Sequence, residues 1–141
     1  MSTLEHLITN DGSSTLKSKV FNSFYHSVHG AIQESNHVFI AAGLEMSLKQ
    51  WNTLSVFELG FGTGLNALLS AIWAEQSKAT IFYDSIDLIP VEDSVWNELN
   101  YTKILIHPDS TDYFKKMHTC PWNRPSFIHS HFTLCKIKAN W

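Results

Sequence analysis

The chain has 141 residues, the length of one domain, and a formal net charge of −3. Apolar residues make up 44% and charged residues 16% of it, a composition that supports a packed core and excludes disorder over most of the length. Cys120 and Cys135 are too few for a disulfide framework, and no apolar run reaches the roughly 18 residues of a membrane span, so we expect a cytoplasmic protein that does not cross a membrane.

Charge is distributed unevenly along the chain. Acidic residues dominate positions 51–100, where Lys78 is the one basic residue, whereas Lys and Arg outnumber Asp and Glu over positions 101–141. A basic end beside an acidic middle is compatible with an edge that faces nucleic acid, and equally with scattered solvated cations.

Residues 1–52 predict an α-rich N-terminal region. Gly, Asn, Asp and Ser form a turn cluster over residues 9–14, because these residue types favour tight turns. Apolar residues then recur at helical spacing over 20–28 and again over 44–51, and Gly30 stands where the first helix would end.

Over residues 53–141 the pattern changes to an alternation of strands and helices. Short β-rich runs are followed by stretches whose apolar residues fall on one helical face. The expected strands cover 55–59, 79–86 and the later part of 127–137, and the expected helices cover 65–72, 92–99 and 113–117. This alternation is typical of an α/β fold with a parallel sheet and right-handed crossovers.

The most specific motif is E-L-G-F-G-T-G at residues 58–64, where an expected strand meets an expected helix. Glycines at such a junction let the backbone turn sharply, and the free N–H groups of the helix start then face a ligand. The spacing is G-x-G-x-G rather than the dinucleotide pattern G-x-G-x-x-G, and Glu58 would repel a pyrophosphate. A carboxylate there suits a ligand with cationic groups, and S-adenosylmethionine has both an ammonium and a sulfonium centre.

The second expected strand ends at Asp87, about where an acidic residue accepts hydrogen bonds from ribose hydroxyls in doubly wound folds. The residues expected to contact the cofactor are Glu58, Gly60, Phe61, Gly62, Thr63, Gly64 and Asp87. A nicotinamide or nucleotide oxidoreductase is a weaker alternative, because both the glycine spacing and Glu58 disfavour it.

Three further segments, together with the glycine motif, resemble a known family. They begin at Tyr25-His26-Ser27, at Glu34-Ser35 (E-S-N-H-V-F-I) and at Ser85-Ile86-Asp87 (S-I-D-L-I-P). In this order and spacing they resemble the S-adenosylmethionine-dependent methyltransferases that complete 5-methylaminomethyl-2-thiouridine at the tRNA wobble position. The resemblance covers roughly residues 9–100 and extends more loosely to the end.

The resemblance implies a Rossmann-like, class I methyltransferase sheet and methyl transfer to the aminomethyl nitrogen of a tRNA uridine. It implies tRNA as a partner, a separate flavin-dependent oxidase that supplies the amine, and positions for Tyr25 and Glu34 beside the cofactor or the amine. Proximity and orientation would carry most of the catalysis, with a group that takes up the ammonium proton.

The family's later Asp-(Ala/Gly)-Phe-Ala-Pro stretch has no counterpart in this chain, so no catalytic residue is assigned. We therefore expect an N-terminal helical region over 1–52 and the first half of a Rossmann-like domain over 53–141, shortened by truncation, with an open sheet edge prone to self-association. The alternative function is a binding or interaction remnant without catalysis.

The eight histidines carry no recognised metal spacing. His26 with His29, and His129 with His131 near the two cysteines, are the pairs that a zinc site would use, and we expect surface or core histidines in place of a metal site. The tryptophans are expected in the core or at its flank.

Overall fold

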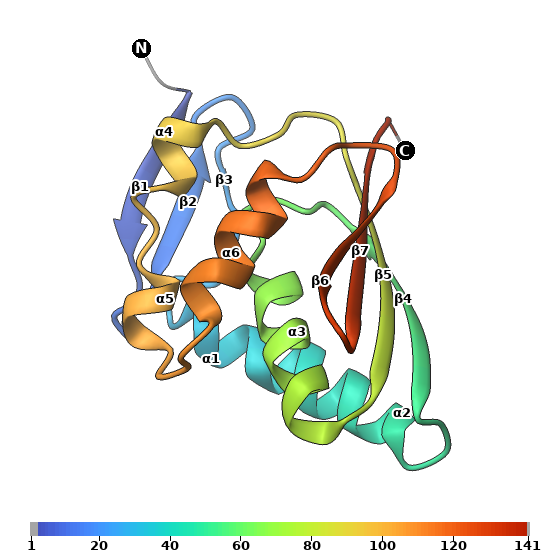
Figure 1. Cartoon of the computed structure of the whole chain (residues 1–141). Coiled ribbons are helices and arrows are strands. Elements are labelled where there is room, and N and C mark those ends of the chain that lie inside the picture. The colour runs from blue at the N-terminus through green and yellow to red at the C-terminus, as the bar shows by residue number, and fades with distance from the viewer. Residues whose placement is uncertain (1–2, 141) are drawn as a thin grey trace.

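The structure, a computed structural model, describes residues 3–140 and contains two sheets with helices between them (Figure 1). The strands are β1 (Leu4–Ile8), β2 (Ser14–Ser18), β3 (Ser23–Phe24), β4 (Thr53–Leu59), β5 (Thr80–Asp87), β6 (Pro125–His129) and β7 (Phe132–Lys138). The helices are α1 (Ala31–Ser35), the π-helix η1 (Asn36–Glu45), α2 (Met46–Leu48), α3 (Leu65–Ser77), α4 (Asp93–Trp96), α5 (Tyr101–Ile104) and α6 (Ser110–Thr119).

The larger sheet has the strand order β4-β5-β7-β6. β4, β5 and β7 are parallel to one another, and β6 pairs antiparallel with β7. This confirms the α/β fold and parallel sheet expected from the alternation of patterns. The expected strand within 127–137 is a hairpin of two strands, because the chain reverses between His129 and Phe132.

One face of this sheet is packed and the other is bare. Ile81, Tyr83 and Leu134 point toward α3 and α6 and are fully buried. The alternate residues of β4 and β5, including Phe57 and Phe82, are exposed on the opposite face. In Figure 1 the helices accordingly lie on one side of the sheet. Because successive side chains of a strand point to opposite faces, the sheet has one face in the core and one face that no helix covers.

The helix expected over residues 20–28 is wrong. Residues 4–24 form an antiparallel sheet, β1-β2-β3, and the turn cluster of residues 9–14 joins β1 to β2. The helical part of the N-terminal region begins only at Ala31. Leu16 and its buried neighbours on β2 pack this small sheet against the core. Phe21 is exposed, so the apolar residues of 20–28 do not form the buried face of a helix.

A polar contact joins the N-terminal sheet to the α/β part. Asn100 Oδ1 accepts a hydrogen bond from the Ser14 N–H at 2.7 Å, and Asn100 Nδ2 donates to the Gly12 carbonyl at 2.9 Å. Because the two segments are far apart in sequence, this side chain ties the first turn of the chain to the region before α5.

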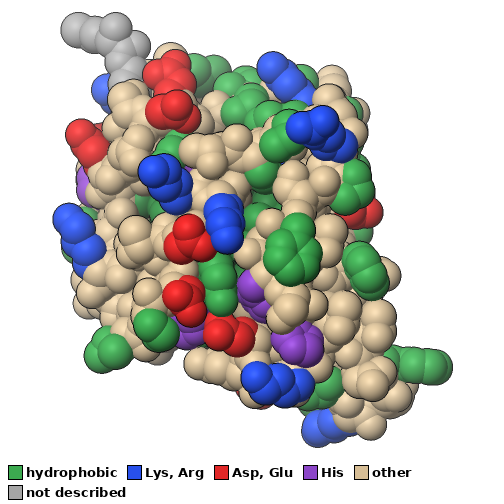
Figure 2. All heavy atoms as spheres, viewed as in Figure 1, with side chains coloured by type: hydrophobic (Ala, Val, Ile, Leu, Met, Phe, Trp, Pro, Cys, Tyr) green, Lys and Arg blue, Asp and Glu red, His purple; other side chains and the backbone are tan. Residues whose placement is uncertain are grey.

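The surface mixes charges of both signs. Figure 2 shows Lys and Arg side chains interspersed with Asp and Glu on this face, with histidines in the lower part of the view and no continuous basic area. On this face the basic tail therefore makes no separate cationic edge. Among the described residues, no helix has the length and apolar character needed to span a membrane.

Candidate functional site

The glycine motif forms a left-handed turn between β4 and α3. Gly60, Gly62 and Gly64 have φ values of 88°, 55° and 77°. Side chains other than glycine rarely adopt this region, which explains why the sequence uses glycine here. A Cβ at Gly62 would lie 3.0 Å from the Tyr25 ring, and one at Gly64 would lie 3.0 Å from His118 Nε2. The turn is therefore both conformationally and sterically specified.

Asp87, the last residue of β5, holds this turn. Its Oδ2 accepts a hydrogen bond from the Gly62 N–H at 2.9 Å, and its Oδ1 accepts one from the Ile89 N–H at 3.1 Å. The Gly60 N–H donates to the Ile86 carbonyl at 2.8 Å, which fixes the turn against the same strand end. Asp87 thus stabilises the backbone of the glycine turn, and a contact between this carboxylate and a ribose remains a prediction.

Two histidines form hydrogen bonds with Thr63, one with its side chain and one with its backbone. His26 Nε2 lies 2.9 Å from Thr63 Oγ1, and His118 Nε2 donates to the Thr63 carbonyl at 3.0 Å. Burial lowers the pKa of His26 and lowers the pKa of His118 to about 4, so both rings are neutral at pH 7. His118 also stacks on Trp96 with 4.7 Å between the ring centroids.

Lys136 is a buried basic residue close to the glycine turn. Its Nζ donates to the His118 carbonyl at 3.2 Å and lies 4.7 Å from the Trp122 ring centroid. Burial lowers its pKa. The sequence offered no signal for Lys136 or His118, because neither lies near the glycine motif in the chain.

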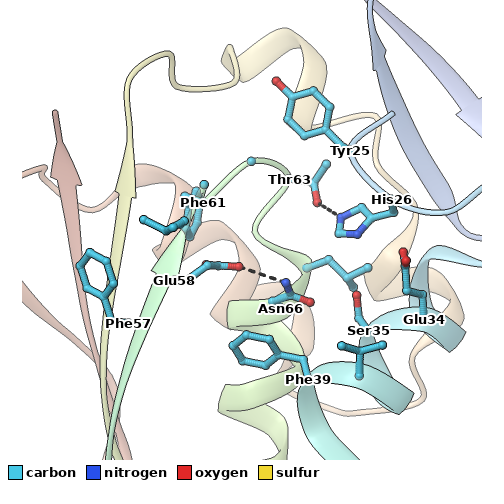
Figure 3. Close-up of a pocket in the computed structure, with 15 residues that line it drawn as sticks. Tyr25, His26, Glu34, Ser35, Phe39, Phe57, Glu58, Phe61, Thr63 and Asn66 are labelled. Atoms are coloured by element: carbon cyan, nitrogen blue, oxygen red, sulfur yellow. Dashed lines mark hydrogen bonds between the residues drawn. The ribbon is translucent and has the colours of Figure 1, made fainter. Parts of the chain in front are cut away.

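Glu58 is 7% exposed and points from β4 toward the start of α3 (Figure 3). Ser85 Oγ donates to Glu58 Oε2 at 2.8 Å, and Asn66 Nδ2 donates to Oε1 at 3.1 Å. Burial and, to a smaller extent, the nearby Asp87 carboxylate raise the pKa of Glu58, these hydrogen bonds lower it, and the net result is a pKa of about 7. The side chain therefore titrates near neutral pH.

Asn66 Oδ1 is a buried acceptor without a hydrogen-bond partner among the described residues. Buried polar atoms are nearly always paired, so this acceptor beside the cavity is open to a donor from a ligand or from water. Glu58 and Asn66 together present oxygen acceptors that suit an ammonium or hydroxyl group.

These side chains border a cavity of about 540 Å³ between the glycine turn and the helices that follow β3 (Figure 3). The volume is in the range of small-molecule sites. Of the residues expected at the site, Tyr25, Glu34, Glu58, Gly60, Phe61, Gly62 and Thr63 line the cavity, and Gly64 and Asp87 do not. The lining residues that sequence reasoning missed are His26, Ser35, Val38, Phe39, Phe57, Leu59, Leu65 and Asn66.

Glu34 and Tyr25 come to the cavity from outside the glycine motif. Glu34 Oε2 accepts a hydrogen bond from the Ser27 N–H at 2.7 Å, which fixes the chain before α1. Burial raises the pKa of Tyr25, and the Asp87 carboxylate adds to that shift. Both residues were singled out through family resemblance, and the fold brings them to the same wall.

The histidine pairs make structural contacts. His26 bonds Thr63, and His129 Nε2 donates to the Ala71 carbonyl at 2.8 Å. No group of three or more His, Cys, Asp or Glu side chains within residues 3–140 is arranged to hold a metal ion.

Comparison with known proteins finds relatives whose name concerns tRNA modification. No family model matches the chain. A segment of 61 residues, 43% of this chain, is 48% identical to the tRNA 5-methylaminomethyl-2-thiouridine biosynthesis bifunctional protein MnmC of Burkholderia multivorans and 39% identical to that of Burkholderia mallei. The segment spans 9% of the length of each of these relatives.

The fold matches a solved structure over nearly the whole chain. MnmC2 from Aquifex aeolicus superimposes with a TM-score of 0.71 at 23% sequence identity, over 99% of this chain and 43% of that one. Over this segment the chain is similar in sequence to MnmC, and over nearly its whole length it shares the Rossmann-like fold of MnmC2.

Proposed function

We propose that the cavity binds S-adenosylmethionine and that the chain is the cofactor-binding part of a methyltransferase acting on the aminomethyl group of a tRNA wobble uridine. The observation that carries the proposal is the unpartnered Asn66 Oδ1 beside the buried Glu58, at the carboxyl end of β4 and next to the glycine turn. Ligands of parallel α/β sheets bind at this end of the strands.

The ammonium group and the ribose of the cofactor have matching acceptors among these residues. Glu58 and Asn66 would accept hydrogen bonds from the ammonium group, the glycine turn would allow close approach, and Asp87 would accept from the ribose hydroxyls. When bound, the cofactor supplies an electrophilic methyl group. The residues of this chain would hold and orient it, and the neutral His26 in the cavity wall is available to accept a proton.

The wider biological role belongs to the same proposal. The relatives' name concerns tRNA 5-methylaminomethyl-2-thiouridine biosynthesis, so tRNA is the proposed substrate and the cytoplasm the proposed location. The amine would come from a separate flavin-dependent oxidase.

The test is calorimetric titration of the 141-residue chain with S-adenosylhomocysteine, comparing Gly60→Ala with Gly12→Ala. The two glycines have nearly the same φ, 88° and 85°, and an added Cβ meets nothing within 4 Å at either position. Both variants should therefore lose the same stability, about 1 kcal/mol. Since only Gly60 lines the cavity, only Gly60→Ala should lose affinity.

Two results would contradict the proposal. One is the absence of heat with a folded chain, and the other is equal binding by both glycine variants. Fluorescence titration with NADH covers the oxidoreductase alternative, which the position of Glu58 in the cavity wall disfavours.

A second candidate function is a binding module without catalysis. The observation that favours it is that β4, the strand carrying the glycine motif, lies at the edge of the sheet. Binding of S-adenosylhomocysteine without methyl transfer to tRNA would support it.

A further inference from the structure

Tyr83, on β5, is a fully buried tyrosine whose hydroxyl has no hydrogen-bond partner within residues 3–140. Buried polar atoms are nearly always paired, because an unpaired one has lost its hydrogen bonds to water without replacement. A phenylalanine would fill the same space without that loss. Packing alone therefore does not explain the hydroxyl of Tyr83.

The sheet brings this hydroxyl close to Glu58. Tyr83 and Ser85 lie two residues apart on β5, so both side chains point to the packed face. In the parallel pairing of β4 with β5, Glu58 lies beside Ser85 and Val56 lies beside Tyr83. Glu58 points to the same face, since Ser85 Oγ donates to its Oε2. The phenol and the carboxyl are thus neighbours on adjacent strands.

Two aromatic rings hold the Tyr83 side chain in place. The centroid of its ring lies 5.4 Å from that of Phe132 and 6.1 Å from that of Phe39. Phe39 belongs to the wall of the cavity (Figure 3). Because a packed ring cannot change rotamer freely, the hydroxyl has a fixed position beside the site.

The two groups influence each other's proton affinity. Burial and then the Glu58 carboxylate raise the pKa of Tyr83 well above its ordinary value. Burial is also the largest effect on Glu58 and raises its pKa, whereas the Tyr83 hydroxyl lowers it. The phenol therefore keeps its proton wherever Glu58 titrates, and it can act as a donor to the charged carboxylate.

Glu58 has room for one more donor. Ser85 and Asn66 each donate to one of its two carboxylate oxygens. A carboxylate has about four acceptor positions, so positions remain after these two hydrogen bonds. Tyr83 is a third donor beside it, and its hydroxyl has no other partner among the described residues.

The charged neighbour of Glu58 acts in the opposite direction. Asp87, at the end of β5, raises the pKa of Glu58 by its negative charge. From the segment before η1, His26 is neutral at pH 7, and Glu34 accepts the Ser27 N–H. The first turns of α3 carry no charged side chain. Within the described chain, neutral donors therefore offset the repulsion from Asp87.

We propose that Tyr83 is a positioning residue, whose hydroxyl donates to the ionised Glu58 carboxylate and holds it toward the cavity, where it receives the cationic group of a ligand. Ionisation of the carboxyl draws the two groups into the hydrogen bond that the present arrangement leaves open. The identity of the ligand group, an ammonium, rests on the proposed function. The pairing of Tyr83 with Glu58 does not require a ligand.

Carbon-13 NMR of the full 141-residue chain without ligand tests this pairing. The Glu58 carboxyl resonance, assigned by its loss in Glu58→Gln, should titrate near pH 7, and Tyr83→Phe should raise that midpoint by about half to one pH unit. Tyr113→Phe is the matched control, because it removes a phenol hydroxyl that donates to Glu75 at 2.9 Å instead. It should leave the Glu58 midpoint unchanged.

Affinity for S-adenosylhomocysteine is the second readout. If the ammonium group binds the ionised form of Glu58, the higher midpoint in Tyr83→Phe should weaken binding about two- to fivefold at pH 7. At pH 9 the carboxyl is ionised in both proteins, so the affinities should agree. A residue that only filled space would change affinity equally at both pH values.

The natural chain offers a third measurement, which remains valid if Tyr83→Phe fails to fold. The Tyr83 Cζ resonance should shift with the same midpoint as the Glu58 carboxyl, because the phenol gains a charged acceptor as Glu58 ionises.

Three results would overturn the proposal: an unchanged Glu58 midpoint in folded Tyr83→Phe, a Tyr83 resonance that does not follow Glu58, or an equal loss of affinity at pH 7 and pH 9. The last would assign Tyr83 to packing. Absence of S-adenosylhomocysteine binding by the natural chain would instead contradict the proposed function, and the two NMR measurements would still decide whether Tyr83 pairs with Glu58.

Discussion

The Gly62 N–H donates a 2.9 Å hydrogen bond to the Asp87 carboxylate, which joins the glycine turn to the end of the neighbouring strand. The two residues are distant in sequence, and each was selected from its own motif. Their contact means that the acidic residue at the end of β5 also fixes the shape of the turn that would receive a ligand. A change at Asp87 is therefore expected to affect both the local stability of the turn and the binding of a ligand there.

We expect Asp87→Ala to weaken both properties. Loss of the contacts to the Gly62 and Ile89 N–H groups should cost about 1.5–3 kcal/mol of unfolding free energy. Affinity for S-adenosylhomocysteine should fall about ten- to a hundredfold if the carboxylate also accepts from the ribose. Urea denaturation and calorimetry measure the two effects.

Asp84→Ala is the matched control for Asp87→Ala. Asp84 lies on the same strand, exposed on the bare face, and its loss should change affinity by no more than about threefold. A larger loss of affinity in Asp84→Ala than in Asp87→Ala would contradict the expected contact between the cofactor and Asp87 at the end of β5.

Glu58→Gln should change how stability depends on pH. The folded-state pKa of Glu58 is raised from 4.5 to about 7, so the unfolded chain releases this proton first as pH rises. The folded state therefore loses about 3 kcal/mol relative to the unfolded state between pH 4.5 and 7, and no more above that. Urea denaturation from pH 4.5 to 8 should show this loss in the natural chain and not in Glu58→Gln.

Affinity provides an independent readout of the same group. Because a carboxylate attracts an ammonium group more strongly than a neutral acid does, S-adenosylhomocysteine should bind more tightly as pH rises through about 7. The same pH dependence in Glu58→Gln would exclude Glu58 as its source.

His118→Ala should destabilise the fold. The substitution removes the hydrogen bond to the Thr63 carbonyl and the stacking partner of Trp96, and leaves a cavity beside Phe61, at a cost of about 2–4 kcal/mol. His37→Ala, at an exposed histidine of η1, should change stability by less than about 0.5 kcal/mol. Chemical denaturation at pH 7 compares the two variants.

The lowered pKa of His118 also predicts acid sensitivity. Burial lowers its pKa from 6.5 to about 4, so the unfolded chain takes up this proton first as pH falls. The natural chain should lose up to about 3 kcal/mol between pH 6.5 and 4 from this group, and His118→Ala should lack that part of the loss. If the unfolding free energy depends on pH in the same way in both proteins, His118 is not the source of the acid sensitivity.

Gly62→Ala should clash with Tyr25. The added Cβ would lie 3.0 Å from the Tyr25 ring at a φ of 55°, so both crowding and backbone strain contribute, at about 1–3 kcal/mol together. In a Tyr25→Ala background only the strain remains, and the cost should be smaller. A double-mutant cycle by urea denaturation measures the difference, and an equal cost in both backgrounds would exclude the clash.

Local patterns in the sequence were enough to predict several secondary-structure elements. The alternation in β4, the one-sided apolar spacing in α3 and the glycines between them indicated a strand, a helix and a tight glycine turn, since each signal lies within a few residues. Residues 20–28 show where such signals fail. These residues include β3, which pairs with β2 in the N-terminal sheet. A local pattern holds no information on such pairing between strands, and the pairing overrode the helical spacing.

Which residues share the site became clear only from the folded chain. Asn66 and His118 carry no distinguishing local signal, and His26 was noted only in a family segment and as one of a histidine pair, yet folding brings all three against the glycine turn. Their chemistry, a neutral ring or an unpartnered amide oxygen, arises from desolvation and from contacts between distant segments. The sequence specifies each of these side chains, but burial and proximity exist only once the chain has folded.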